Sequence, residues 1–241
     1  MRVKKAGWAV RAGLTVLLMG MMAMTARSQA RIGIRGGLNL ANVTTDKDGN
    51  TDNSHLLPSF NAGVFADLPL ADELALQPGI LLNGKGSKVN IRSGALNTDM
   101  DIRMNPLYLE VPVNFVGKIP ISADGDTRLL LGAGPYAAFG IGGNVRTKGT
   151  FLGGDVDEKS SIEWDDDTPF SNDDRNQGWN KLKRFDYGAN LMAGFQFDNV
   201  GITANYGLGL ANIHSGSDND NSEWKSRNRV WSISLNYLFD D

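Results

Sequence analysis

The stretch Arg229-Val230-Trp231-Ser232-Ile233-Ser234-Leu235-Asn236-Tyr237-Leu238-Phe239 decides the fold, because it alternates with a period of two. One side carries Trp231, Ile233, Leu235, Tyr237 and Phe239, while Ser232, Ser234 and Asn236 fall on the other. Successive side chains of a strand point to opposite faces, so the alternation predicts a β-strand. Aromatic residues stand at both ends of the apolar row, with aliphatic residues between them. This order is typical of a strand that crosses an outer membrane, where rings favour the interfaces and aliphatic chains the hydrocarbon.

The start of the chain has the pattern of a secretory signal peptide. Arg2, Lys4 and Lys5 precede an apolar run from about Ala12 to Ala26, and Ser28-Gln29-Ala30 supplies small residues for cleavage. This order of charged, apolar and small segments is that of a signal peptide, and the apolar run is too short for a comfortable membrane-spanning helix. We therefore expect residues 1–30 to be removed and the mature chain to begin near Arg31, with a membrane anchor as the alternative.

Composition narrows the class of protein further. The chain has 241 residues, 29 Gly, no Cys and a formal net charge of −3. Disulfides are excluded, and the charge gives no reason to expect a nucleic-acid partner. The length after residue 30 suits one barrel domain, residues 31–241.

Seven further segments share the alternation of the closing stretch. They are Arg31 to Val43, Ser59 to Leu70, Glu73 to about Val89, Asp99 to Lys118, Thr127 to Lys148, Phe185 to Phe197 and Val200 to Ile213. The connections between them are alternately short and long, which is the pattern of periplasmic turns and extracellular loops. The sequence thus predicts an all-β fold, an antiparallel up-and-down transmembrane β-barrel of eight strands.

The longest connection is an acidic stretch at about residues 149–183, which includes Asp165-Asp166-Asp167. We expect an extracellular loop here, part of which extends the flanking strands as a hairpin beyond the membrane. Ten strands is the alternative, if that hairpin enters the membrane.

The orientation of the apolar row separates two fold classes. A soluble lipocalin-like barrel has an apolar interior, whereas a membrane barrel has an apolar exterior and a polar interior. The signal peptide and the aromatic ordering favour the membrane barrel. An eight-stranded barrel is just wide enough for side chains to fill, so its charges must be paired. We expect Arg35, Asp67, Lys85 and Glu110 to be structural charges in the interior, with Glu110 paired to Arg35, to Lys85 or to both.

Two segments resemble a known family. Gly33-Ile34-Arg35-Gly36-Gly37-Leu38-Asn39-Leu40-Ala41-Asn42 resembles the first-strand pattern GIKGGLNxSN of the PorT-like outer-membrane β-barrel proteins of Bacteroidota. Tyr108-Leu109-Glu110-Val111-Pro112-Val113 resembles the YLEIPxL strand of the same family. The resemblance implies a small antiparallel barrel in the outer membrane of a Gram-negative bacterium. Named members of the family take part in protein secretion, but the acidic stretch departs from the family pattern, so that role does not carry over.

The sequence offers little chemistry. His55 and His214 are its histidines, and we expect both in extracellular loops. A rim enzyme could use His214 with Asp218 or Asp220, or Ser54 with His55, but no nucleophile stands at a diagnostic spacing. The acidic segments Asp165-Asp166-Asp167 and Asp218-Asn219-Asp220-Asn221-Ser222 could bind Ca²⁺, yet neither has the EF-hand spacing.

We therefore predict no catalysis, no cofactor and no metal site. The expected function is that of an integral outer-membrane barrel with a structural, binding or secretion-associated role. Its expected partners are outer-membrane lipid and a protein that docks on the extracellular loops. The alternative is a narrow channel or transporter for small solutes.

Overall fold

The computed structural model describes residues 30–47, 50–53, 55–93, 97–122, 124, 126–166, 181–213 and 225–240. Nearly all of the expected signal peptide, residues 1–29, lies outside this part of the chain. Every regular element within it is a β-strand. None of its segments forms a helix long and apolar enough to span a membrane.

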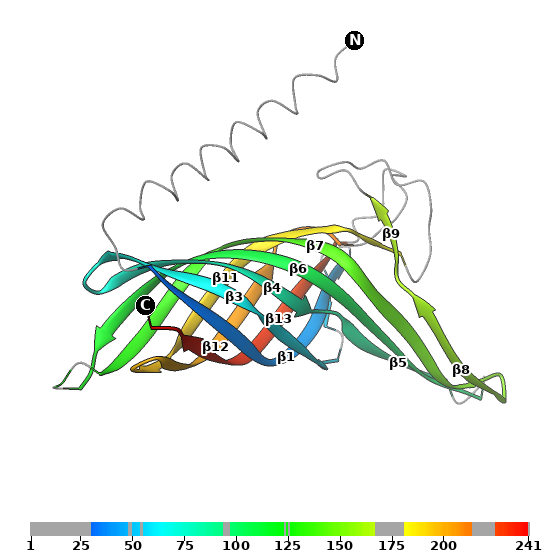
Figure 1. The fold of residues 1–241 in the computed structure, drawn as a ribbon. Helices are drawn as coiled ribbons and strands as arrows, with labels where there is room; N and C mark the ends of the chain where they lie inside the picture. Colours follow the sequence, from blue (N-terminus) through cyan, green and yellow to red (C-terminus); the bar gives the residue numbers. More distant parts are fainter. Residues whose placement is uncertain are drawn as a thin grey trace, which may run out of the picture.

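Eight strands form a closed ring (Figure 1). Each pairs antiparallel with the next in the chain, and β13 returns to pair with β1 over Gly33 to Asp46. The stretch that decides the fold lies in β13 and hydrogen-bonds to β1 on one side and to β12 on the other. The ring strands are β1 (Arg31–Lys47), β3 (Leu57–Ala71), β4 (Leu74–Gly84), β6 (Thr98–Pro120), β7 (Thr127–Phe151), β11 (Phe185–Phe197), β12 (Val200–Gly209) and β13 (Lys225–Leu238).

The two ends of the ring differ in their connections. Short turns at 72–73, 121–126 and 198–199 lie at the end where the chain enters at Arg31 and leaves after Leu238 (Figure 1). The opposite end carries the long connections, which contain β2 (Asn50–Asn53), β5 (Ser87–Ser93), β8 (Gly154–Ser161), β9 (Glu163–Asp166) and β10 (Lys181–Lys183). The predicted alternation of short and long connections is confirmed.

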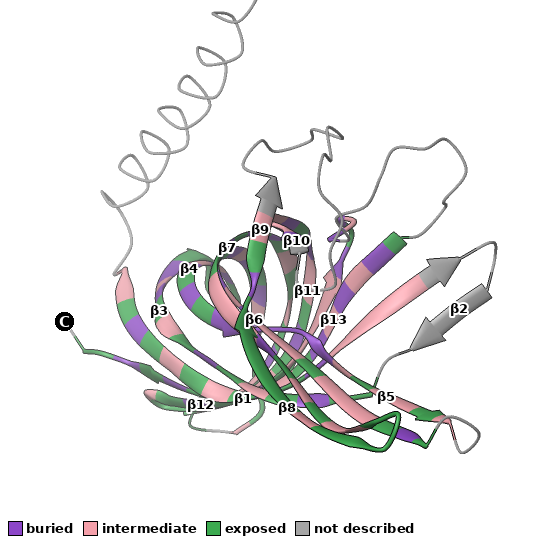
Figure 2. Ribbon diagram, turned by 90° about the vertical axis from the view of Figure 1, so that its right-hand side faces the viewer, coloured by how far each residue is buried: buried purple, intermediate pink, exposed green. Residues whose placement is uncertain are grey.

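The ring is apolar outside and polar inside. Leu191, Ile233 and Leu235 are 57%, 67% and 60% exposed, whereas Glu110 is 3% exposed. Buried and exposed residues alternate along each ring strand (Figure 2). The structure therefore confirms the membrane-barrel orientation over the lipocalin-like one.

Two ring strands continue well past the ring and, with two further strands, extend the same sheet beyond it; we call this extension the projecting sheet. It consists of β5, residues 98–105 of β6, residues 143–151 of β7, and β8. In Figures 1 and 2 it leans away from the ring. The stretch from about 149 to 183, expected as an extracellular loop that partly extends the flanking strands as a hairpin, begins with such a hairpin, because β7 runs to Phe151 and β8 folds back on it. β8 pairs with β7 alone among the described strands, so the ring has eight strands and not ten.

The change from ring to projecting sheet occurs at two glycines with positive φ, Gly86 at +118° and Gly143 at +138°. A Cβ on Gly86 would lie 2.0 Å from the carbonyl oxygen of Met104, and one on Gly143 would lie 2.4 Å from that of Asn105. An L-residue would be strained at either position as well as crowded. The pairing of β6 with β7 also shifts register between Leu107 and Tyr108. Lys85 immediately precedes this junction and therefore lies at the outer end of the ring.

Candidate functional site

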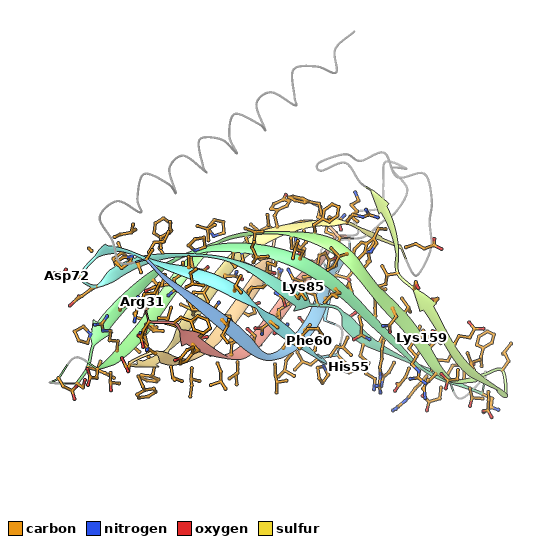
Figure 3. All side chains as sticks on the ribbon, in the orientation of Figure 1. Arg31, His55, Phe60, Asp72, Lys85 and Lys159 are labelled. Carbon is orange, nitrogen blue, oxygen red and sulfur yellow. The ribbon has the colours of Figure 1, made fainter. Side chains whose placement is uncertain are left out.

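All four charged residues predicted for the interior lie on the inner side of the ring. Asp67, Lys85 and Glu110 are at most 3% exposed, and Arg35 is half-buried. Asp67 belongs to β3, Glu110 to β6 and Arg35 to β1, while Lys85 directly follows β4, and all four share the side of the sheet occupied by the polar row. Figure 3 shows Lys85 within the ring.

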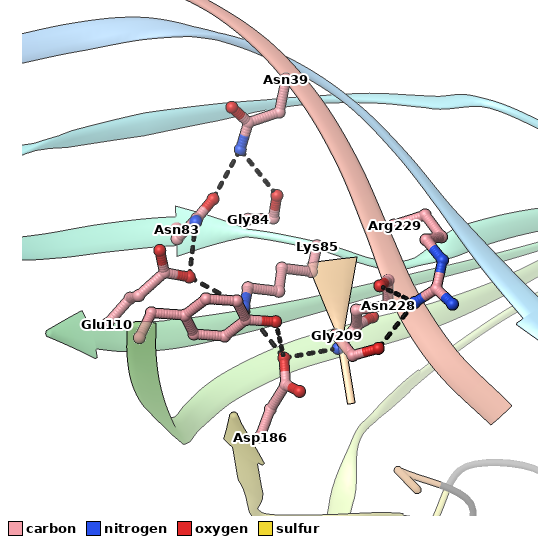
Figure 4. Close-up of polar contacts among 10 residues, drawn as sticks. Asn39, Asn83, Gly84, Lys85, Glu110, Asp186, Gly209, Asn228 and Arg229 are labelled. Atoms are coloured by element: carbon pink, nitrogen blue, oxygen red, sulfur yellow. Dashed lines mark hydrogen bonds and ion pairs between the residues drawn. The ribbon is translucent and has the colours of Figure 1, made fainter. Parts of the chain in front are cut away.

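Lys85 lies at the centre of a buried ion-pair cluster (Figure 4). Its Nζ donates to Glu110 Oε2 at 2.8 Å and to Asp186 Oδ2 at 2.9 Å. The ammonium group also stands 4.2 Å from the centre of the Tyr136 ring, which presents its negative face to the cation. Lys85 follows β4 and Asp186 belongs to β11, three positions further round the ring, so this side chain crosses the lumen.

The structure adds Asp186, which the sequence reasoning missed. Its Oδ2 accepts hydrogen bonds from Asn228 Nδ2 at 3.0 Å and from the Tyr136 hydroxyl at 3.3 Å, besides the bond from Lys85. One signal was present in the sequence, because Asp186 shares the parity of Asn190 and Gln196 on β11 and so had to point inward. Asp186 is the second residue of β11 and follows the acidic stretch, so in the sequence it cannot be told apart from the loop carboxylates.

A chain of hydrogen-bonded polar side chains extends the cluster to β1 and β3 and links it to further positions on β4 and β13. Asn83 donates to Glu110 Oε2 at 2.8 Å, and Asn39 donates to Asn83 Oδ1 at 2.7 Å. Asn61 donates to Asn39 Oδ1 at 2.7 Å, and the Ser234 hydroxyl donates to Asn61 Oδ1 at 3.1 Å. Since each amide both donates and accepts, the network fixes the register of β1, β3, β4, β6 and β13 relative to one another.

A second group of charges lies nearer the short-turn end. Asp67 is fully buried and forms an ion pair with Lys118, which is also buried. Gln77 donates to Asp67 Oδ1 at 2.9 Å, and Arg31 Nη2 stands 3.9 Å from Asp67 Oδ2. Lys118 was not among the predicted interior charges, although its parity on β6 matches that of Glu110.

Arg35 does not pair with Glu110, so of the two partners considered for Glu110 only Lys85 forms the ion pair. The register places Arg35 opposite Asn236, and its Nε donates to Asn236 Oδ1. Its guanidinium lies 5.1 Å from the centre of the Phe65 ring and reaches Met192 Sδ on β11, at 3.9 Å. Like Lys85, Arg35 spans strands three positions apart in the ring.

Arg35 separates two small cavities in the interior. The one between Arg35 and Lys85 has a volume of about 40 Å³, and its polar lining includes Asn61, Asn83, Asn114 and Asn190. The other, towards the short-turn end, measures about 10 Å³. A single water needs roughly 10–15 Å³ by this measure, so the two spaces have room for a few water molecules and for no larger solute.

The outer end of the ring is covered by an apolar cluster. Trp164 of β9 packs edge-on against Tyr108, with ring centres 5.4 Å apart. Gly140 lies directly beneath the indole, because a Cβ there would come within 2.2 Å of it. Ile162 and Leu182 pack with Val145 beside this contact, and all three are less than 10% exposed. Residues of the acidic stretch, for which the sequence predicts an extracellular loop with a hairpin, therefore cover the outer end of the ring.

The other candidate sites receive no support from the described residues. His55 forms a backbone bridge to Lys88 at the edge of β5 and is exposed. His214, the segment 218–222, Ser54 and the side chains of Asp165-Asp166-Asp167 lie outside the described residues, so the structure does not test the proposals made on them. Among the side chains that are described, no group of three His, Cys, Asp or Glu is placed to hold a metal ion.

Several solved structures of outer-membrane proteins align with most of this chain. The attachment invasion locus protein Ail of Yersinia pestis aligns with 14% identity and a TM-score of 0.38 over 87% of this chain and 99% of that one. OprG of Pseudomonas aeruginosa aligns with 15% identity and a TM-score of 0.42 over 89% and 98%. The outer membrane protease OmpT of Escherichia coli aligns with 10% identity and a TM-score of 0.36 over 87% and 97%. Comparison with curated protein sequences gives no match.

A family model described as "Outer membrane protein beta-barrel domain" matches residues 22–215, which is most of the chain. Barrels of this kind place their short turns in the periplasm and their long connections outside the cell. The chain therefore belongs to the outer membrane protein beta-barrel domain family and resides in the outer membrane of a Gram-negative bacterium.

Proposed function

We propose that this protein is a closed, non-conducting barrel that anchors the projecting sheet on the outer surface of the membrane, where the sheet serves as a binding surface. The role is structural and binding, without catalysis. One observation carries the proposal: Lys85 and Arg35 each cross the lumen at a different level, from β4 to β11 and from β1 to β11.

Each crossing is held by partners that resist displacement. Lys85 has two carboxylates and a tyrosine ring around its ammonium group, and it is 1% exposed. Moving it aside to open a path would leave Glu110 and Asp186 as unpaired buried charges, which costs several kcal/mol. The lid of Trp164, Ile162 and Leu182 adds an apolar barrier outside the cluster. These features argue against the alternative, a narrow channel or transporter for small solutes.

We also propose that this protein shares a common ancestor with the PorT-like proteins. The first motif lies on β1, where a Cβ on Gly37 would come within 2.3 Å of the carbonyl oxygen of Ile233. The second lies on β6 and contributes Tyr108 and Glu110 to the interior cluster. Both motifs thus serve close strand packing and the buried charges. They support common descent as a barrel and carry no argument for a secretion role.

Planar-bilayer recording tests the closed lumen. Purified protein, refolded in detergent and shown by heat-modifiable migration to be a barrel, should insert and give no unitary conductance at 1 M KCl. A sixteen-stranded porin in the same bilayer serves as the positive control, because its lumen is open to water. Stable conductance steps from the wild-type barrel would overturn the proposal in favour of the channel.

A further inference from the structure

The outward face of the projecting sheet is the direct continuation of the lipid-facing wall of the ring. On β6 the outward residues run from Leu109 and Leu107 through Asn105 to Arg103, and then to Asp101 and Asp99. On β7 the register places Gly142, Asn144 and Arg146 opposite Leu107, Asn105 and Arg103. The exterior therefore changes from apolar to neutral polar, then to cationic and last to a mixed level in which carboxylates outnumber cations, in the direction away from the ring.

The cationic level is a row of four basic side chains, one from each strand of the projecting sheet. Lys88 of β5 pairs with Arg103 of β6, Arg103 with Arg146 of β7, and Arg146 with Lys159 of β8. We call these four residues the cation row. Like charges directly opposite one another destabilise a sheet, so a row of four needs compensation.

Acidic residues compensate the cation row only in part. Asp101 stands 3.0 Å from Lys88 and 3.9 Å from Arg103, and Asp157 accepts from Arg146 at 3.2 Å while also pairing with Lys148. Lys159 forms no ion pair among the described side chains. Over the whole outward face, six cations (Lys88, Arg92, Arg103, Arg146, Lys148, Lys159) stand against four carboxylates (Asp99, Asp101, Asp155, Asp157), and the carboxylates lie on the far side of the row from the ring.

The cation row lies just beyond the headgroup region of the outer leaflet, at a distance that extended Lys and Arg side chains can span. Arg103 lies four residues beyond Leu107, the last apolar outward residue on β6, which is roughly 13 Å along the strand. A strand tilt of about 40° reduces this to roughly 10 Å along the membrane normal, and headgroups extend about 5–8 Å beyond the hydrocarbon. The projecting sheet leans away from the ring (Figure 1), and its outward face continues the lipid-facing wall of the ring. Figure 3 places Lys159 on this sheet, well beyond the ring.

We propose that the cation row binds the phosphate groups of anionic lipid in the outer leaflet. Clustered Lys and Arg next to a membrane-spanning segment attract anionic headgroups, with about 1 kcal/mol for each basic residue near the surface. Arginine holds phosphate with two parallel hydrogen bonds, and Arg103 and Arg146 stand at the centre of the row, each about half-exposed. Bound phosphates would neutralise the repulsion along the row. The inference rests on the proposed function for the outward position of the sheet, but not on a closed lumen.

Binding of lipid A to the refolded barrel in detergent tests the inference, with native mass spectrometry as the readout. The double variant R103Q/R146Q removes two charges from the row. The matched control R92Q/K148Q removes two charges from the same face, further from the ring. We expect the row variant to weaken binding of bisphosphorylated lipid A by about 10- to 30-fold, as expected for two surface cations, and the control to stay within about twofold of wild type.

Lipid A stripped of both phosphates should bind wild type and R103Q/R146Q equally weakly. Equal binding of bisphosphorylated lipid A by wild type and R103Q/R146Q would overturn the proposal, provided that heat-modifiable migration shows both to be folded. Inorganic pyrophosphate, a soluble phosphate without acyl chains, should not displace the lipid at equimolar concentration. If it does, the row is a general polyanion site and the assignment to lipid is wrong. Bilayer conductance is a separate readout, so failure here leaves the closed-lumen proposal standing.

Discussion

The cluster at Lys85 and the cluster at Asp157 contain the same kinds of ion pair, with similar distances but opposite surroundings. Lys85 lies 2.8 Å and 2.9 Å from its two carboxylates, and all three side chains are at most 4% exposed. Asp157 lies 3.2 Å from both Arg146 and Lys148, and all three are about half-exposed on the projecting sheet. When an exposed pair is broken, water solvates both charges, so the loss of free energy is small. When a buried pair is broken, the remaining charge has no water around it, so the loss is large. On the proposed function, the buried pairs hold the barrel closed, while the exposed pairs leave their cations available to other anions.

The largest effect that separates the two clusters should come from Lys85→Met. The substitution removes the ammonium group that both carboxylates contact, and so leaves Glu110 and Asp186 as uncompensated buried charges. Breaking a buried pair costs about 3–5 kcal/mol. We expect the free energy of unfolding in urea, measured in detergent by the loss of heat-modifiable migration, to fall by that amount.

The control is Lys148→Met, which removes an equal charge from the Asp157 cluster and should leave the urea midpoint unchanged. Glu110→Gln provides a second comparison, because Lys85 then keeps Asp186 as its partner, and we expect a smaller loss of about 1–3 kcal/mol. Equal midpoints for Lys85→Met and Lys148→Met would show that burial does not distinguish the clusters.

The smallest effect should come from Asp157→Asn. Hydrogen bonds from Arg146 and then from Lys148 hold the pKa of the Asp157 carboxyl below its ordinary value of 3.8. A lowered pKa in the folded state stabilises the fold above the ordinary value, and this contribution is lost as the pH falls through the lowered value. We expect at most a slight fall in the urea midpoint at pH 7, and a correspondingly shallower decline in the midpoint below about pH 4, where the variant has no carboxylate contribution to lose.

Asp155→Asn is the matched control for that measurement, since Asp155 lies on the same strand and face and forms no ion pair among the described side chains. Its acid decline should follow that of wild type. A fall in the midpoint of Asp157→Asn at pH 7 as large as that of Glu110→Gln would contradict the contrast between exposed and buried pairs.

The alternation of residues was enough to predict the ring and the side of each strand that faces in. Arg35, Asp67, Lys85 and Glu110 could be placed in the interior because parity along one strand is a local property. The partners of these charges could not be predicted in the same way. Whether Glu110 meets Lys85 or Arg35 depends on register between strands far apart in the chain, and the register places Arg35 opposite Asn236 instead.

The projecting sheet was harder to predict than the ring. The register shift between Leu107 and Tyr108 reverses the parity of β7, so that Arg146 and Lys148 point outward although Phe139 and Ile141 did so before them. Nothing in the sequence distinguishes Gly143, whose φ is positive, from the many other glycines of the chain. The cation row cannot be recognised without this shift, because it depends on the register of four paired strands.

The central claim is that the apolar row touches lipid while the polar row is enclosed, and neighbouring residues of β13 test it most directly. The chain has no Cys, so Ile233→Cys and Ser234→Cys each introduce a single labelling site. With Ile233 67% and Ser234 1% exposed, brominated lipid should strongly quench a bimane label at position 233 and leave one at 234 nearly unquenched. Strong quenching at 234 with none at 233 would place the apolar row inside and contradict the account.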